Sequence, residues 1–136
     1  MMGSITSYVK FIQGVIPMSA ASGAKNGRVI DCQGFDRACH VLDVGILPST
    51  GSARASIWES ATSGGTYTII SGTLISTIAS IGGTAAYCID VPVNVAKPYQ
   101  KSLTTLATPA GFGGIVVLYS GTRLLPPTQE KTATVV

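Results

Sequence analysis

Charge is scarce in this sequence. Only 11% of its 136 residues are Asp, Glu, Lys or Arg, whereas an ordinary soluble domain carries about 25%. So few charges exclude a long charged helix or a coiled coil, and an apolar fraction of 46% excludes a solvated disordered chain. A freely diffusing monomer usually needs more charge to stay dispersed. The composition therefore favours a subunit that packs among other subunits.

Runs of one charge sign and long apolar runs are both missing. Nine basic and six acidic residues give a net charge of +3, and the basic residues are scattered singly, so no row of cations faces a line of phosphates. The uncharged stretches 60–89 and 103–122 are broken by Gly, Ser, Thr or Pro and hold no run of ~18 apolar residues. We expect neither a nucleic-acid nor a membrane partner.

Groups that carry catalysis or bind metals are also few. His40 is the only histidine, and its neighbour Cys39 would point to the opposite face of a strand, which excludes a Cys–His dyad. No G-x-S-x-G nucleophile motif occurs. Because Cys32, Cys39 and Cys88 lack C-x-x-C spacing, we interpret them as small buried thiols of a reducing cytoplasm. We expect no enzyme activity, no cofactor and no metal, with His40 as a packed or paired strand residue.

Alternation of apolar and polar residues dominates what is present. In Ala38–Leu47, for example, Leu42 and Val44 share one face and Cys39 and Val41 the other. About eight such segments recur, separated by turn signals; one of them, Leu74–Ile81, also fits helical spacing. The pattern predicts an all-β, single-domain β-sandwich, either jelly-roll or immunoglobulin-like. The expected strands are Arg28–Cys32, Ala38–Leu47, Ala53–Ser60, Tyr67–Ile70, Leu74–Ile81, Thr84–Val91, Tyr99–Ala107 and Gly114–Tyr119.

The two ends of the chain do not follow this alternation. Residues 1–27 hold one apolar patch followed by a Gly-rich loop signal, and are predicted to form an extended N-terminal arm or edge strand and then a loop. Residues 28–123 are predicted to form the β-sandwich. Residues 124–136 are predicted to form an extended tail, because the consecutive prolines Pro126 and Pro127 exclude regular structure.

Several of these segments resemble small virion proteins of tailed bacteriophages that are encoded close to the major capsid protein. A hydrophobic-Asp-x-x-Gly-Phe turn leads into a long apolar strand, a basic-aromatic strand start follows, and a last apolar strand ends in a Pro-containing tail. The resemblance spans residues 28–127. The segments that carry it are Val29–Asp36, Cys39–Gly45, Ile57–Ser60 with Ser63–Gly65, Lys97–Lys101, and Ile115–Tyr119 with Leu124–Pro126.

The resemblance implies a capsid cement, or decoration, protein. Such a structural subunit is made in the host bacterial cytoplasm, binds the capsid exterior and bridges neighbouring copies of the major capsid protein. It implies that protein as a partner, together with a homodimer or homotrimer of the chain itself. Extended apolar segments suit such contacts. The expected interface residues are Tyr8, Phe11, Ile12, Val15, Ile16, Leu124, Leu125, Pro126 and Pro127.

Two other functions stay open at this point. Cement proteins of this kind are often acidic, and residues 1–27 have no counterpart among them, which leaves a head–tail joining or tail protein as an alternative. Trp58, together with the tyrosines, suggests a carbohydrate-binding β-sandwich module. For Trp58 itself a core or interface position is the favoured interpretation.

Overall fold

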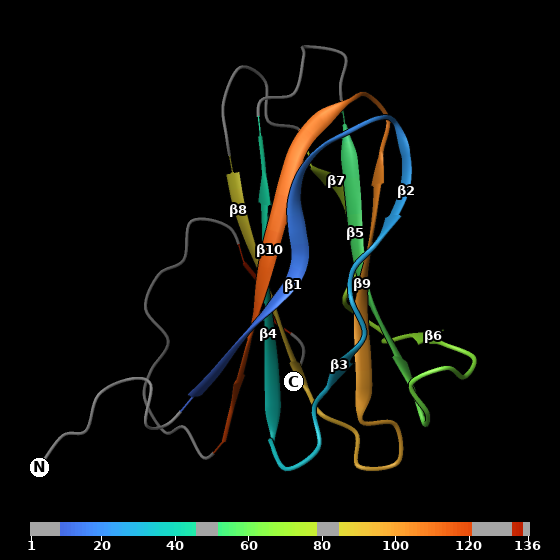
Figure 1. Cartoon of the computed structure of the whole chain (residues 1–136), viewed down its shortest axis with the longest axis vertical. Coiled ribbons are helices and arrows are strands. Elements are labelled where there is room, and N and C mark those ends of the chain that lie inside the picture. The colour runs from blue at the N-terminus through green and yellow to red at the C-terminus, as the bar shows by residue number, and fades with distance from the viewer. Residues whose placement is uncertain (1–8, 46–51, 79–84, 121–131, 135–136) are drawn as a thin grey trace, which may run out of the picture.

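The fold is described here from a computed structural model that covers residues 9–45, 52–78, 85–120 and 132–134. In these residues the chain forms a β-sandwich of two facing sheets, with strands running nearly vertically in Figure 1. The strands are β1 (Val9–Ala20), β2 (Gly23–Asn26), β3 (Ile30–Asp31), β4 (Arg37–Val44), β5 (Ala53–Ser60), β6 (Thr68–Ile69), β7 (Ile75–Ile78), β8 (Ala85–Pro92), β9 (Tyr99–Leu106), β10 (Ala110–Tyr119) and β11 (Thr132–Thr134).

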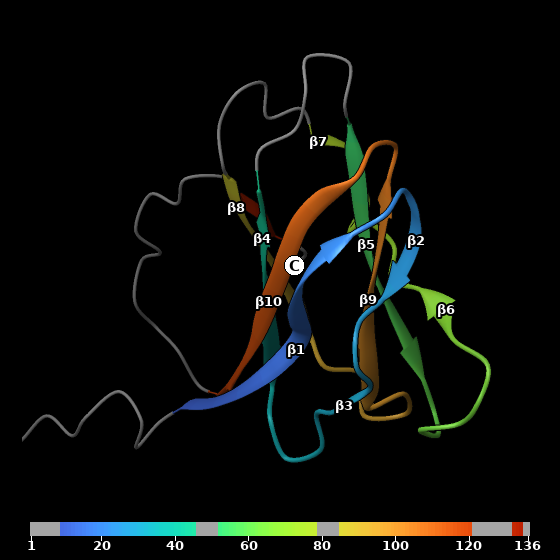
Figure 2. The ribbon, with the colours of Figure 1, turned by 45° about the horizontal axis from the view of Figure 1, so that its top comes forward.

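The two sheets draw their strands alternately from the sequence. Sheet A has the order β1-β10-β4-β8-β11, and sheet B has the order β2-β9-β5-β6, with β3 paired to β9 and β7 paired to β5. All these pairs are antiparallel except β11, which runs parallel to β8. Figure 2 shows β1, β10, β4 and β8 on one side of the sandwich and β2, β9, β5 and β6 on the other.

The connectivity distinguishes between the two predicted topologies. The chain crosses from one sheet to the other six times, between β1 and β2, β3 and β4, β4 and β5, β7 and β8, β8 and β9, and β9 and β10. Strands that are hydrogen-bonded are therefore distant in sequence, as in the interleaved Greek keys of a jelly roll. The predicted all-β sandwich is confirmed, and its form is jelly-roll-like.

Strand alternation places the core between the sheets. In β4 the side chains of Ala38, Leu42 and Val44 are buried, whereas Asp43 lies exposed on the outer face. Sheet B contributes an unusual inner face, because every buried residue of β9 except Leu106 is polar. The core therefore combines aliphatic side chains, such as those of β4 and β5, with the hydroxyl and amide groups of β9.

One hydrogen bond joins the two sheets through this core. His40 of β4 donates from Nε2 to Oε1 of Gln100 of β9, with 2.9 Å between the atoms. Both side chains are buried. Burial lowers the pKa of His40 to about 4, against a smaller opposing effect of the Gln100 hydrogen bond. The imidazole is therefore neutral near pH 7, and the interpretation of His40 as a paired strand residue is confirmed.

The N-terminal boundary predicted from the sequence needs correction. The sandwich was predicted to begin at residue 28, after an arm or edge strand and a loop, but β1 is the edge strand of sheet A, paired with β10, and β2 pairs with β9 in sheet B. Register shifts interrupt β1 between Gln13 and Val15 and again between Val15 and Met18. Such bulges break the period-two pattern of a strand, which is why the sequence of β1 did not show alternation.

The predicted C-terminal tail is corrected in part. Within 124–136, the strand β11 adds to sheet A beside β8.

The other strands match their predicted bounds to different degrees. β5 has the predicted bounds, the ambiguous segment at 74–81 contains the strand β7, and β10 begins at Ala110 rather than at Gly114. Pro109 and the glycines after it had indicated a loop there.

The interpretation of the cysteines also changes. The register opposes Cys39 to Asp90 and Val41 to Cys88, so the two cysteines are diagonal neighbours on the outer face of sheet A. They form a disulfide, with 6.4 Å between the Cα atoms, where free thiols were expected. The two cysteines are 49 residues apart in the sequence, and no short motif such as C-x-x-C indicates that they pair. Cys32 is a free buried thiol, and burial together with nearby Asp31 raises its pKa to about 12.

Candidate functional site: an apolar groove on sheet A

The outer face of sheet A is hollowed along β10. Gly111, Gly113 and Ile115 lie on the outer face of β10, because successive residues of a strand alternate between its two faces and Phe112 and Val116 face the core. Neither glycine fills the outer face with a side chain: Gly111 is exposed there, and Gly113 lies beneath Pro17. The resulting groove has a volume of about 710 Å³, within the ~300–1,000 Å³ of typical ligand pockets.

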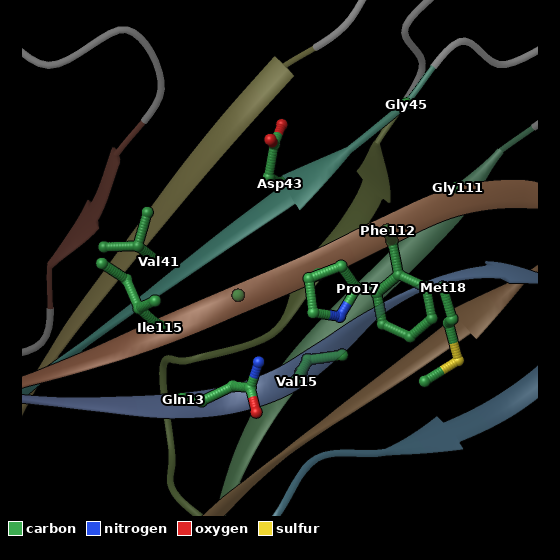
Figure 3. A pocket seen from close by; sticks show the side chains of 12 residues that line it. Gln13, Val15, Pro17, Met18, Val41, Asp43, Gly45, Gly111, Phe112 and Ile115 are labelled. Carbon is green, nitrogen blue, oxygen red and sulfur yellow. The ribbon is translucent and has the colours of Figure 1, made fainter.

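The bulged strand β1 forms one wall of this groove. Pro17 lies so close to Gly113 that a Cβ on the glycine would stand 3.1 Å from the Pro17 Cα. Figure 3 shows Pro17 beside β10, between Ile115 and Phe112. A glycine is therefore needed at 113 for the bulge to fold over the sheet. The second bulge of β1, between Val15 and Met18, is thus part of the candidate site.

The opposite wall and the rim come from β4 and from the start of β1. Val41 lies next to Ile115 in the register, and Figure 3 shows their side chains side by side. The polar side chains at the rim are those of Gln13 and Asp43. A single carboxylate and a single amide around an apolar floor suit an apolar partner far better than an ionic one.

Further apolar side chains extend this face beyond the groove. Ile16 is 55% exposed, Phe11 47% and Ile115 44%. Phe11 sits opposite Val117 of β10 on the outer face. The Cys39–Cys88 disulfide lies on the same outer face. We call the groove, these exposed apolar residues and the disulfide the sheet A face.

A polar cluster bounds the sheet A face at one end. Arg37 Nε lies 3.1 Å from Asp90 Oδ1, and the hydroxyl of Tyr119 donates to the other carboxylate oxygen. Burial first, and then the bond to Asp90, raise the pKa of Tyr119 to about 12. The phenol thus stays protonated. The cluster ties β4, β8 and β10 together rather than supplying a reactive group.

The expected interface residues separate into two groups. Phe11 and Ile16 lie exposed on or beside the sheet A face, whereas Val15 is 2% exposed in the core and Ile12 packs partly against it. The register turns Ile12 and Val15 inward, although Val15 also lines the groove (Figure 3). The other expected contacts, Tyr8, Leu124, Leu125, Pro126 and Pro127, lie outside the described residues.

Of the two positions favoured for Trp58, core or interface, the structure excludes the core. It is half-buried on the outer face of sheet B, opposite Lys101 of β9.

In the part of the chain that the structure describes, no three His, Cys, Asp or Glu side chains are grouped to hold a metal ion. No helix in those residues is long and apolar enough to cross a membrane.

Fold and face together define a jelly-roll β-sandwich with an apolar outer surface. No protein family and no curated protein matches the sequence. Among solved structures, a chain of infectious bursal disease virus, Gx strain, is similar with a TM-score of 0.55 and 8% identity, over 85% of this chain and 34% of the viral one. This chain thus spans about a third of that protein.

Two further solved structures are also similar. A chain of naturally occurring empty particles of cowpea mosaic virus has a TM-score of 0.45 and 11% identity, over 90% of this chain and 92% of that one. The CBM36-1 domain of a xylanase from the hindgut metagenome of Trinervitermes trinervoides has values of 0.48 and 10%, over 84% and 99%. At these identities the similarity shows the fold alone.

Proposed function

We propose that this protein is a capsid cement subunit that binds the outside of a phage head and stabilises contacts between major capsid proteins. The observation that carries the proposal is the sheet A face, with its 710 Å³ groove and its almost uncharged rim. Exposed apolar patches of this kind usually mark protein interfaces. The scarcity of charge and the sequence resemblance of residues 28–127 point the same way.

The mechanism is physical rather than chemical. An extended apolar segment of the capsid protein fills the groove beside Ile115, and each bound subunit adds buried surface across a seam between capsomers. One contact is weak, but a symmetric oligomer that engages several seams gains from effective concentration. The edge strand β1 offers the subunit a second type of contact, strand addition. We propose a homodimer or homotrimer for this reason.

A matched pair of substitutions tests the proposal. Ile115 and Ile69 are 44% and 45% exposed, the first on sheet A and the second on sheet B. Purified protein is mixed with empty shells of the phage head whose genome encodes it, and binding is measured by cosedimentation. We expect Ile115→Asp to lose binding at least tenfold and Ile69→Asp to retain it. Equal binding by both variants would reject the sheet A face as the docking surface.

The same assay separates this function from its alternative. Binding through an uncharged face persists in roughly molar NaCl, since few ion pairs are present to be screened. A cement protein occupies the shell in hundreds of copies. A head–tail joining or tail protein would instead be found at one end of the particle in a few copies, and that result would replace the cement function.

A further inference from the structure

The outer face of sheet B, opposite the sheet A face, carries a separate hollow. Its volume is about 280 Å³, at the lower limit of the ~300 Å³ typical of small-molecule sites. Such a space accepts one small ring rather than a peptide. The residues around it are Asn26, Trp58, Gly65, Tyr67, Lys101 and Leu103.

Both aromatic rings at this hollow are held in place by the protein. Trp58 Nε1 donates to Ser56 Oγ at 2.9 Å, and the hydroxyl of Tyr67 donates to the Ser63 carbonyl oxygen at 2.8 Å. The polar ends of the rings are therefore occupied, and a ligand would meet their faces and edges. Rings fixed before binding lose little entropy when a ligand stacks on them.

Hydrogen-bonding groups stand beside the rings. The ammonium of Lys101 lies 4.5 Å from the centre of the Tyr67 ring, in cation–π contact. Asn26 pairs with Leu103 in the register, so its exposed amide lies on the same outer face. An amide and an ammonium together offer donors and an acceptor within reach of a ring bound over Trp58.

We propose that this hollow binds a pyranose sugar of a surface glycan. A pyranose has an apolar face of C–H groups, which stacks on an aromatic ring, and a rim of hydroxyls, which suits an amide and an ammonium. Nucleic acid fits less well, because Lys101 is the only cation that lines the hollow and a phosphate backbone needs a series of them. The proposal goes beyond the cement function and does not depend on it.

Trp58 is the only tryptophan of the chain, so its fluorescence reports on this hollow alone. The intact protein is titrated with methyl glucoside, N-acetylglucosamine, galactose and galacturonate, and with oligothymidylate. We expect saturable changes in emission with at least one sugar, at millimolar dissociation constants, and none with oligothymidylate. Saturation-transfer NMR with the same sugars provides a second readout that does not need the indole.

Variants assign the site. Tyr67→Ala and Lys101→Ala are expected to weaken sugar binding at least tenfold in both assays. Phe11→Ala, an aromatic change on the sheet A face, should leave it unchanged, and thermal melting checks that each variant is folded. Failure of all four sugars, binding of oligothymidylate instead, or binding that survives both sheet B substitutions would overturn the proposal. Capsid binding by the same variants is scored separately, so the two proposals fail independently.

Discussion

Acid should destabilise this protein through one residue, His40. Its pKa is about 4 in the folded protein against 6.5 for an ordinary histidine, because burial disfavours the imidazolium. The unfolded chain therefore takes up a proton in a range where the folded protein does not. The resulting stability is fully present above pH 6.5, decreases as the pH falls toward 4, and is lost below that.

The size of the effect follows from the shift. Each pKa unit corresponds to ~1.4 kcal/mol, so His40 contributes about 3 kcal/mol to the pH dependence. Domains of this size are stable by only ~5–15 kcal/mol. The loss is therefore large enough to move a urea midpoint clearly.

The measurement compares urea unfolding at pH 7.5, 5.5 and 4.0 for the natural chain and for a His40→Leu/Gln100→Leu variant. The double change removes both members of the buried hydrogen bond, so neither is left unpaired. The two proteins share every other ionisable group, including Asp90, which affects the His40 pKa electrostatically, so the difference between them isolates His40. Equal acid sensitivity of the two, or an NMR titration of the single histidine near pH 6.5, would refute the reasoning.

Two further predictions concern sheet A. Gly114→Ala should lower the free energy of unfolding by ~1–3 kcal/mol, because its Cβ would stand 2.5 Å from the Val41 carbonyl oxygen; the same change at Gly64, where a Cβ meets nothing within 4 Å, is the control in chemical denaturation. Dithiothreitol should lower stability by about 2–4 kcal/mol, since the disulfide joins residues 49 apart. A Cys39→Ala variant that responds equally to the reagent would contradict this.

Regular strands could be predicted from the sequence, and irregular ones could not. β5 was predicted at its observed bounds because Ala53, Ala55 and Ile57 face the core while Arg54 faces solvent. β1 was missed as part of the sandwich because two bulges shift its register. A pattern of period two cannot be recognised when the strand itself changes face.

The candidate site was predictable only in fragments. Phe11 and Ile16 were selected as exposed apolar contacts, but nothing local indicates that Val41 and Ile115 lie beside them, since those residues are 74 apart in the sequence and meet only through the register. The glycines Gly111 and Gly113 indicated a loop, although both lie in β10 and Gly113 lets Pro17 approach that strand. The Cys39–Cys88 pairing was likewise set by register.

The position of β10 also determines when sheet A can form during synthesis. β10 lies between β1 and β4, yet it is the last long strand of sheet A to leave the ribosome. Until it emerges, β1 lacks its hydrogen-bonding partner and exposes residues such as Val15 that are buried in the folded protein. Pairings this distant in sequence form slowly and are prone to aggregate before they close. A chain that stalls on the ribosome shortly before codon 110 should therefore be recognised by chaperones, whereas a chain released after codon 120 contains β10 and can pair it with β1 and β4.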